Sequence, residues 1–131
     1  MNIQKIQFGK NLPPEIFSSI AEEAAETISA NRNANKSTQL RKFYDELVMF
    51  NDRIQAVKRE QRDARFKEME PFIRMLNAKA AYALGRQLVD DNFVNILSQC
   101  IREIKDYETL RHCKLFMEAM IGFRKAKEAT R

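Results

Sequence analysis

The residues of this sequence that could act as acids, bases or nucleophiles do not form a recognisable catalytic set. The only histidine, His112, lies in LRHCKLF without a serine or cysteine nucleophile in a recognisable setting. Carboxylates occur as adjacent pairs at Glu22–Glu23, Asp45–Glu46 and Asp90–Asp91. Neighbours on a helix point about 100° apart, so these pairs do not converge on one substrate. We therefore expect the protein not to be an enzyme.

Metal and cofactor sites are not expected either. The sequence has no Glu-x-x-His pair of the kind that di-metal bundles use, no zinc-ligand spacing and no glycine-rich phosphate loop. Cys100 and Cys113 are not closely spaced, and we interpret them as buried cytosolic thiols rather than a disulfide or a metal pair. The prediction is no metal and no cofactor.

The charge is unevenly distributed along the chain. The net charge is +5, and residues 1–36 hold four basic and four acidic residues, so residues 37–131 carry the whole excess. A basic domain of this kind suits nucleic acid or an anionic membrane, although many basic domains bind neither. No stretch resembles a signal peptide or is long enough to span a membrane, which favours a cytoplasmic protein without a membrane partner.

The first group of cations lies on a helix predicted to begin at Ser37 or Thr38. Lys42 and Arg53 are eleven residues apart, within about 20° of one another, and almost opposite the apolar side of that helix. Arg41 and Arg59 form a second aligned pair, and Lys36 precedes the helix. Three interleaved acidic residues favour the alternative that this face is simply solvated.

A second stripe, on the next predicted helix, combines cations with an aromatic ring. Met75, Lys79, Tyr82 and Arg86 recur at steps of four, three and four, and no acidic residue occurs from 72 to 89. Such a ladder can follow a phosphate backbone while the ring packs on a sugar or base. The alternative is long side chains that flank a core, with the tyrosine half buried. Neither stripe has the pattern of a major-groove reader, so we expect contacts to backbone rather than to base sequence.

Apolar residues recur at three- and four-residue steps throughout, which predicts an all-α, single-domain bundle of about five helices. The first helix is expected over 11–30, opening at a proline pair, and the second runs to about residue 57. The third is expected to start at Pro71 and to pass through Gly85, where a small residue would allow close packing. A fourth follows a cap at 90–92, and a fifth ends in a basic last turn. Residues 1–12 are expected to be irregular, and 58–68 to be the solvated end of a helix or an exposed loop.

The predicted core comprises the inner stripes of these helices. Its main members are Ile16, Ile20, Ala24, Ile28, Leu40, Phe43, Tyr44, Leu47, Phe50, Ile54, Val57, Phe72, Ile73, Leu76, Ala80, Ala83, Phe93, Ile96, Leu97, Cys100, Ile101, Ile104, Leu110, Cys113, Met117, Met120 and Ile121. The stripe of the second helix is long for so small a core. This length favours self-association or a helical partner.

Three blocks in order carry a resemblance to a known family. STQLRKFYDEL, PFIRMLNAKAAYALGR and FMEAMIGFRK resemble the small α-helical subunit of type III-A CRISPR effector complexes, the Csm small-subunit family. With the helices between them they cover most of residues 36–127. The block AKAAYALGR stands where that family shows a Lys-x-x-x-Tyr-like run ending in Gly-Arg, but Lys79 and Tyr82 are three residues apart here.

The resemblance implies a non-catalytic subunit of an antiviral ribonucleoprotein. Its members stack as several copies beside backbone and large subunits, line the path of CRISPR RNA and target RNA, and leave cleavage to a neighbour. Together, the two stripes and the resemblance give the candidate RNA-binding residues Lys36, Arg41, Lys42, Arg53, Lys79, Tyr82 and Arg86. The alternative is a helical protein–protein scaffold without RNA contact, in which an exposed apolar position such as Met49 would matter.

Overall fold

A computed structural model of the chain describes residues 1–130. Within that range all regular secondary structure is helical. Its six α-helices are α1 (Ser19–Ser29), α2 (Ser37–Gln55), α3 (Arg62–Arg74), α4 (Leu76–Gly85), α5 (Asp91–Arg102) and α6 (Tyr107–Ala129). Three short 3₁₀ helices, η1 (Ile3–Lys5), η2 (Gly9–Asn11) and η3 (Arg59–Gln61), lie in the connecting segments. The all-α prediction is confirmed, and the single helix expected after Pro71 corresponds to α4 and the end of α3.

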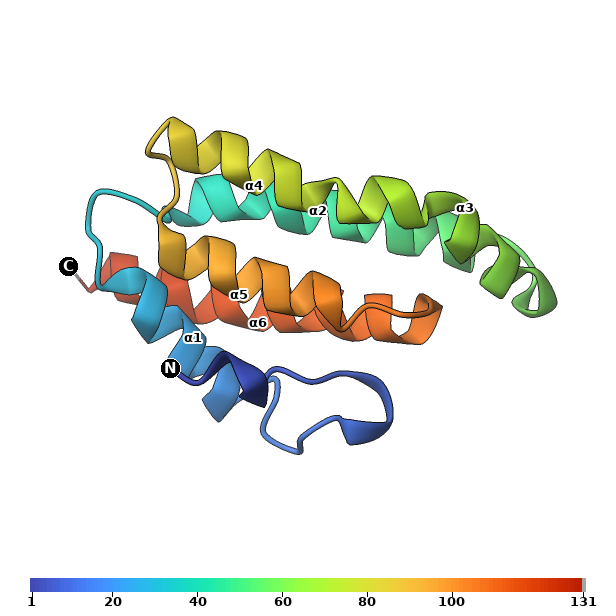
Figure 1. The fold of residues 1–131 in the computed structure, drawn as a ribbon. Coiled ribbons are helices and arrows are strands. Elements are labelled where there is room, and N and C mark those ends of the chain that lie inside the picture. Colours follow the sequence, from blue (N-terminus) through green and yellow to red (C-terminus); the bar gives the residue numbers. More distant parts are fainter. Residues whose placement is uncertain (131) are drawn as a thin grey trace.

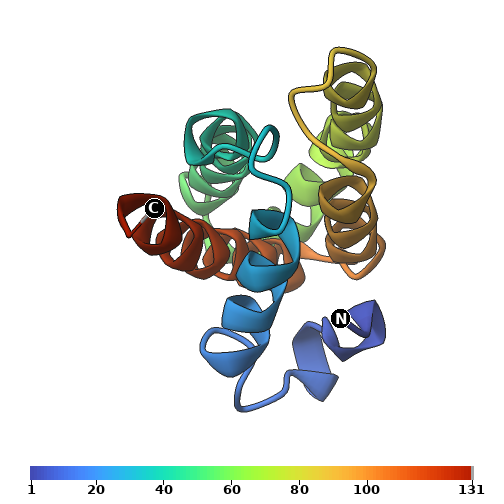
Figure 2. The same cartoon turned by 90° about the vertical axis from the view of Figure 1, so that its left-hand side faces the viewer.

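The helices pack in layers around α6, the longest of them. α6 makes its most extensive contacts with α1 and α2, while α4 packs mainly on α5. α3 and α4 follow one another as a bent rod that runs antiparallel to α2 (Figure 1). The turned view separates the pair α2 and α6 from the pair α4 and α5, with α1 and the N-terminal segment on the far side of α6 from α2 (Figure 2). α2 and α4 therefore lie on the same side of the molecule.

The first helix begins later than the proline pair. Residues 14–18 form turns, in which the Ile16 N–H donates to the Pro13 carbonyl at 3.2 Å, and α1 starts only at Ser19. The backbone of Ser18 (φ −120°, ψ −99°) lies outside the helical region, which prevents the α-helical ladder from starting earlier. The proline-initiated helix was therefore a wrong prediction, although Ile16 is buried as expected.

Most of the charged segment 58–68 is exposed, and it begins in the connection between α2 and α3 rather than at the end of α2. It holds η3 and the first turns of α3, and its Phe66 is buried against the core. Pro71 lies inside α3, on its exposed side, rather than in a first turn. Two further expectations fail on the same rod: Phe72 is exposed rather than inward, and α4 ends at Gly85, where an added Cβ would meet nothing within 4 Å.

The apolar stripe of α2 is covered within the chain. Leu40, Phe43, Leu47, Phe50 and Ile54 are all buried, and the Phe43 ring lies 5.2 Å from that of Phe93 on α5. The expectation that this stripe exceeds what one subunit covers is therefore wrong, because α6 and the α3–α4 rod lie on either side of it. The large apolar side chains that remain exposed are on α3 and α4 instead.

The predicted cap of α5 and most of the predicted inner stripes of α5 and α6 are confirmed. Asp90 caps α5 by accepting from the Phe93 N–H at 3.1 Å, and Asp106 caps α6 in a capping box with Thr109. Ile121 is only half buried, whereas Phe116, which the pattern did not single out, is fully buried. Among the residues described, no helix has the length and apolar character needed to cross a bilayer.

Candidate nucleic-acid interface

A groove separates α2 from the α3–α4 rod and contains most of the cations predicted to contact RNA. Its wider part, of about 430 Å³, is lined by Glu46, Met49, Phe50, Arg53, Arg65, Glu68, Met69, Phe72, Met75 and Lys79. An adjoining part, of about 290 Å³, is lined by Gln39, Lys42, Phe43, Glu46, Lys79, Tyr82, Ala83, Arg86 and Leu88. The groove is open because α2 packs on α3 and α4 on α5, while direct contact between α2 and α4 is slight. Hence the two basic stripes of the sequence face one another across a single depression.

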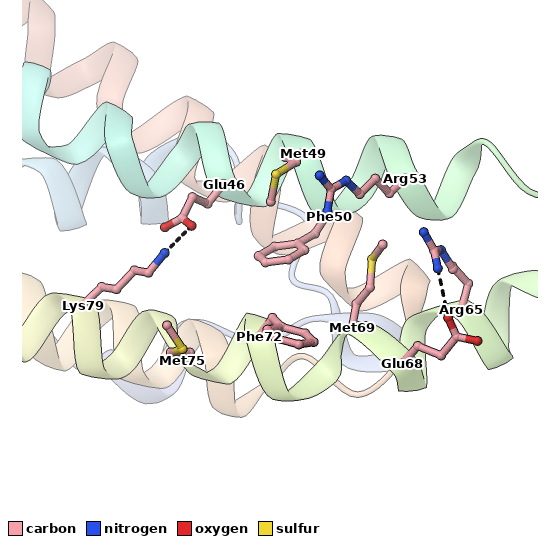
Figure 3. A pocket seen from close by; sticks show the side chains of 10 residues that line it. All are labelled: Glu46, Met49, Phe50, Arg53, Arg65, Glu68, Met69, Phe72, Met75 and Lys79. Atoms are coloured by element: carbon pink, nitrogen blue, oxygen red, sulfur yellow. Dashed lines mark hydrogen bonds and ion pairs between the residues drawn. The ribbon is translucent and has the colours of Figure 1, made fainter.

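Two of the groove's cations are neutralised by carboxylates. Lys79 Nζ lies 2.5 Å from Glu46 Oε1 across the groove, and Arg65 Nη1 lies 2.9 Å from Glu68 Oε2 on α3 (Figure 3). Although residues 72–89 contain no acidic residue, Glu46 of α2 lies beside Lys79 in the folded chain. Sequence reasoning placed Glu46 among the solvated acids of α2 and missed that it faces Lys79. Glu46 precedes Arg53 by seven residues, which places both on the same face of α2. This spacing indicated which face of α2 Glu46 occupies, but not its contact with Lys79.

Lys42, Arg53 and Arg86 form no ion pair among residues 1–130. All three side chains are exposed and line the groove from both of its walls. Each retains its positive charge and its hydrogen-bond donors for an outside partner. The groove therefore has a net positive charge after its internal pairs are counted.

Apolar and aromatic side chains lie between these cations. Tyr82 is 69% exposed, and the Arg86 guanidinium carbon lies 5.9 Å from its ring centroid. Phe72 and Met75 are 61% and 51% exposed, and they line the groove from the α3–α4 rod, while Met49 lines it from α2 (Figure 3). An exposed ring beside an unpaired guanidinium can stack on a base or sugar while the cation contacts phosphate.

The other two predicted RNA-contacting residues lie elsewhere. Arg41 is on the α6 side of α2, 3.9 Å from Asp45, and lines a small depression with Tyr44 and Lys125. Lys36 precedes α2 at the end of the bundle. Arg59 belongs to η3 rather than to α2, so its predicted alignment with Arg41 on one helix is wrong.

His112 has a structural environment rather than a catalytic one. It is buried, its Nδ1 accepts from the Gly9 N–H at 3.1 Å, and its Nε2 lies 3.6 Å from Glu108. Burial, aided by nearby Arg111, lowers the pKa of His112, which favours the neutral ring that this hydrogen bond requires. The histidine thus holds the N-terminal segment against α6.

The thiols and carboxylates of the described residues form no metal-binding cluster. Cys100 and Cys113 are free and buried, and burial raises the pKa of the Cys100 thiol. Between residues 1 and 130 no three His, Cys, Asp or Glu side chains gather in a way that could hold a metal ion. The groove is therefore the candidate site that the geometry supports.

Comparison with known proteins gives one match. The family model described as Csm2 Type III-A matches residues 12–130, nearly the whole chain. No curated protein and no solved structure gives a significant match.

Proposed function

Because the chain belongs to the Csm2 Type III-A family, the small subunits of type III-A CRISPR effector complexes, we propose that it contacts RNA through the groove between α2 and α4. The contact surface consists of Lys42, Arg53, Lys79, Tyr82 and Arg86. Arg41 and Lys36 are separate from it.

The observation that carries this proposal is the convergence of unpaired cations beside an exposed ring. Lys42 and Arg53 come from α2, Arg86 comes from α4, and none has an acidic partner among the residues described. Cations that are exposed and unpaired can neutralise phosphates and release their counterions, so the affinity should fall steeply with salt concentration. The ring of Tyr82 adds a stacking surface that accepts any base.

The same residues argue for binding that is independent of RNA sequence. Lysine and arginine on the walls of a shallow groove contact phosphates, whereas sequence reading needs side chains aimed at base edges. The subunit would therefore favour capture of target RNA along the CRISPR RNA while leaving sequence recognition to base pairing.

The wider role that we propose is that of a non-catalytic subunit in antiviral defence, acting in the cytoplasm where the effector meets its RNA targets. Several copies would stack beside the backbone and large subunits. Such a stack needs two different complementary surfaces on each copy, a head-to-tail contact.

A protein–protein scaffold is the second candidate, and one observation favours it. Phe72 and Met75 are exposed beside Met49, which is half buried in the groove, and apolar side chains in a groove can also receive a partner's helix. If this is the main role, Phe72→Ser with Met75→Ser would disrupt assembly, and reversal of the groove's charges would leave RNA capture unchanged.

The deciding experiment compares two charge-reversed proteins. Lys42→Glu with Arg86→Glu changes the groove, and Lys58→Glu with Arg59→Glu makes the same charge change at exposed positions away from it. Reconstituted effector containing the groove variant should capture target RNA at least about tenfold more weakly, because two phosphate contacts are lost and two repulsions are introduced. The control variant should retain most of the capture. Equal capture by both, with unchanged helical circular dichroism, would contradict the proposal.

A further inference from the structure

A second cationic cavity lies at the N-terminal end of α2, apart from the groove. It has a volume of about 360 Å³ and is lined by Arg32, Lys36, Arg124 and Glu128. The first two residues precede α2, and the others come from the last turns of α6. The cavity thus forms where the start of one long helix meets the end of another, and no residue of the groove lines it.

Arg124 is a buried cation whose hydrogen-bonding capacity is only partly used. It is 1% exposed; its Nε donates to the Asn35 carbonyl at 2.9 Å and its Nη2 to the Ala34 carbonyl at 3.5 Å. Its Nη1 has no partner. A buried guanidinium normally has its donors satisfied and its charge compensated, because leaving either unmet costs free energy. Arg124 Nε also lies 3.9 Å from Glu128 Oε1, so one carboxylate lies beside this charge. The unused Nη1 donor still leaves capacity for a further acceptor next to the cavity that Arg124 lines.

Glu128, the single carboxylate of the cavity, is already engaged at the start of α2. Its Oε1 accepts from the Ser37 N–H at 2.7 Å and its Oε2 from the Ser37 hydroxyl at 3.0 Å. Burial acts to raise the pKa of Glu128, but these hydrogen bonds and the nearby Arg124 outweigh burial and lower it. Glu128 is thus ionised at neutral pH and compensates one positive charge, while three cations line the cavity.

The remaining donors lie on the rim and on the helix end. Lys36 Nζ donates to the Arg32 carbonyl at 2.7 Å, which leaves two of its three N–H groups for another partner. Arg32 is exposed and forms no ion pair within residues 1–130. The backbone N–H of Thr38, in the first turn of the 19-residue α2, has no hydrogen-bond partner there either. A helix N-terminus with open amides and adjacent cations attracts anions.

We propose that this cavity binds a phosphate group. Two rim cations and the buried Arg124 line the cavity beside the N-terminus of α2, and they match the charge and the several acceptor oxygens of phosphate. The phosphate can come from an RNA backbone or from a small phosphate compound, and the cavity is large enough for a phosphate with a linked group. The site is independent of the groove, so its test is separate from that of the proposed RNA contact.

The test is a titration of ¹⁵N-labelled protein followed through the backbone amide signals of Ser37 and Thr38. One arm uses inorganic phosphate, and the other uses a short RNA without terminal phosphates, which offers only phosphodiesters. Saturable shifts at these two amides in either arm support the site. Saturation with RNA alone assigns it to the RNA backbone, and saturation with inorganic phosphate as well assigns it to small phosphates.

Variants make the outcome specific. Arg32→Gln with Lys36→Gln removes both rim charges and leaves Arg124, which holds the Asn35 carbonyl, in place. We expect this variant to saturate at least tenfold more weakly. Lys58→Gln with Arg59→Gln should saturate like the unmodified chain in both arms, and the groove variant Lys42→Glu with Arg86→Glu should do so with inorganic phosphate. Absence of saturable shifts in both arms, or unchanged saturation in Arg32→Gln with Lys36→Gln, would overturn the proposal.

Discussion

The turn around Asn35 and the groove between α2 and the α3–α4 rod both place polar groups between helices. Around Asn35 these groups are hydrogen-bonded within the chain, whereas several of those in the groove are unpaired within residues 1–130. Asn35 is fully buried; its Nδ2 donates to the Ile28 carbonyl at 3.1 Å and to Asp90 Oδ1 at 2.7 Å. Its Oδ1 accepts from the Asp90 N–H at 3.0 Å, so the amide is satisfied inside the chain. In the groove, Lys42 and Arg86 are exposed and have no acidic partner among the residues described.

The contrast extends to chemically identical side chains. The hydroxyl of Tyr44, on the α6 side of α2, donates to Glu118 at 2.9 Å, and burial together with this carboxylate raises the pKa of the tyrosine. Tyr82 in the groove is 69% exposed, and the Arg86 guanidinium lies beside its ring. Burial makes internal pairing obligatory, whereas exposed groups can remain unpaired until a partner arrives. The groove's polar groups are therefore available for binding, and those around Asn35 hold the fold.

The strongest test of this contrast is removal of the Asn35 amide. Asn35→Ala leaves Ile28 and Asp90 without their partner and puts alanine at φ 58°, which asparagine tolerates better. We expect a loss of about 2–4 kcal/mol in the free energy of unfolding, from buried groups left unsatisfied and from backbone strain. Urea denaturation followed by circular dichroism measures it.

Asn33→Ala is the matched control, since Asn33 is exposed on the same turn. Its free energy of unfolding should change by less than about 0.5 kcal/mol. A loss of similar size in both variants would mean that the Asn35 amide has no special role.

Most of the fold could be predicted from the sequence, because helical periodicity reports directly which side of each helix is buried. The inward stripe of α5 is buried as predicted, as are Leu40, Phe43, Leu47, Phe50 and Ile54 of α2, whereas Tyr44 and Val57 are only half buried. The errors occur where local and tertiary effects compete. The proline pair suits a first turn, yet the backbone of Ser18 delays α1. Phe72 fits the period of α3 but lies exposed beside the groove.

Only part of the candidate site could be predicted from the sequence. Periodicity aligned Lys42 with Arg53 on one helix and Lys79 with Arg86 on the next, but it could not show that the two stripes share a groove. The ion pair between Lys79 and Glu46 is a contact between residues 33 positions apart, which no local pattern encodes. Arg124 was assigned to a basic last turn, and its burial depends on carbonyls contributed by residues 34 and 35.

The second test concerns the exposed ring of the groove. Tyr82→Ala should weaken RNA binding about five- to thirtyfold, because a base stacked on an aromatic side chain contributes about 1–2 kcal/mol. Tyr82→Phe, which retains the ring, should bind almost as well as the unmodified chain. Fluorescence anisotropy with labelled single-stranded RNA at low salt measures both. If the two substitutions weaken binding equally, the hydroxyl rather than the ring makes the contact.

The third test measures how the stability of the fold depends on pH through the buried His112. The pKa of His112 is lowered in the folded chain, so unfolding takes up a proton below the ordinary value of 6.5. The stability that His112 contributes is therefore complete above pH 6.5 and is lost as the pH falls toward the folded pKa. Melting temperatures measured between pH 7.5 and 5 should fall, and they should fall less in His112→Asn, whose amide oxygen can replace Nδ1 as the acceptor for Gly9. Identical pH profiles would exclude His112 as the cause.

The smallest expected effect concerns the ion pair that spans the groove, between Glu46 and Lys79. Glu46→Gln releases Lys79 and removes a negative charge from the groove that we propose contacts RNA. Since the pair is partly exposed, its loss should change the free energy of unfolding by less than about 0.5 kcal/mol, while RNA binding should strengthen about two- to threefold at low salt. Asp52→Gln, an exposed acid of α2 outside the groove, is the control and should change binding less. Weaker binding by Glu46→Gln would show that Glu46 positions Lys79 for RNA. Internal pairing would then fix the side chains in this part of the groove, as internal hydrogen bonds do around Asn35.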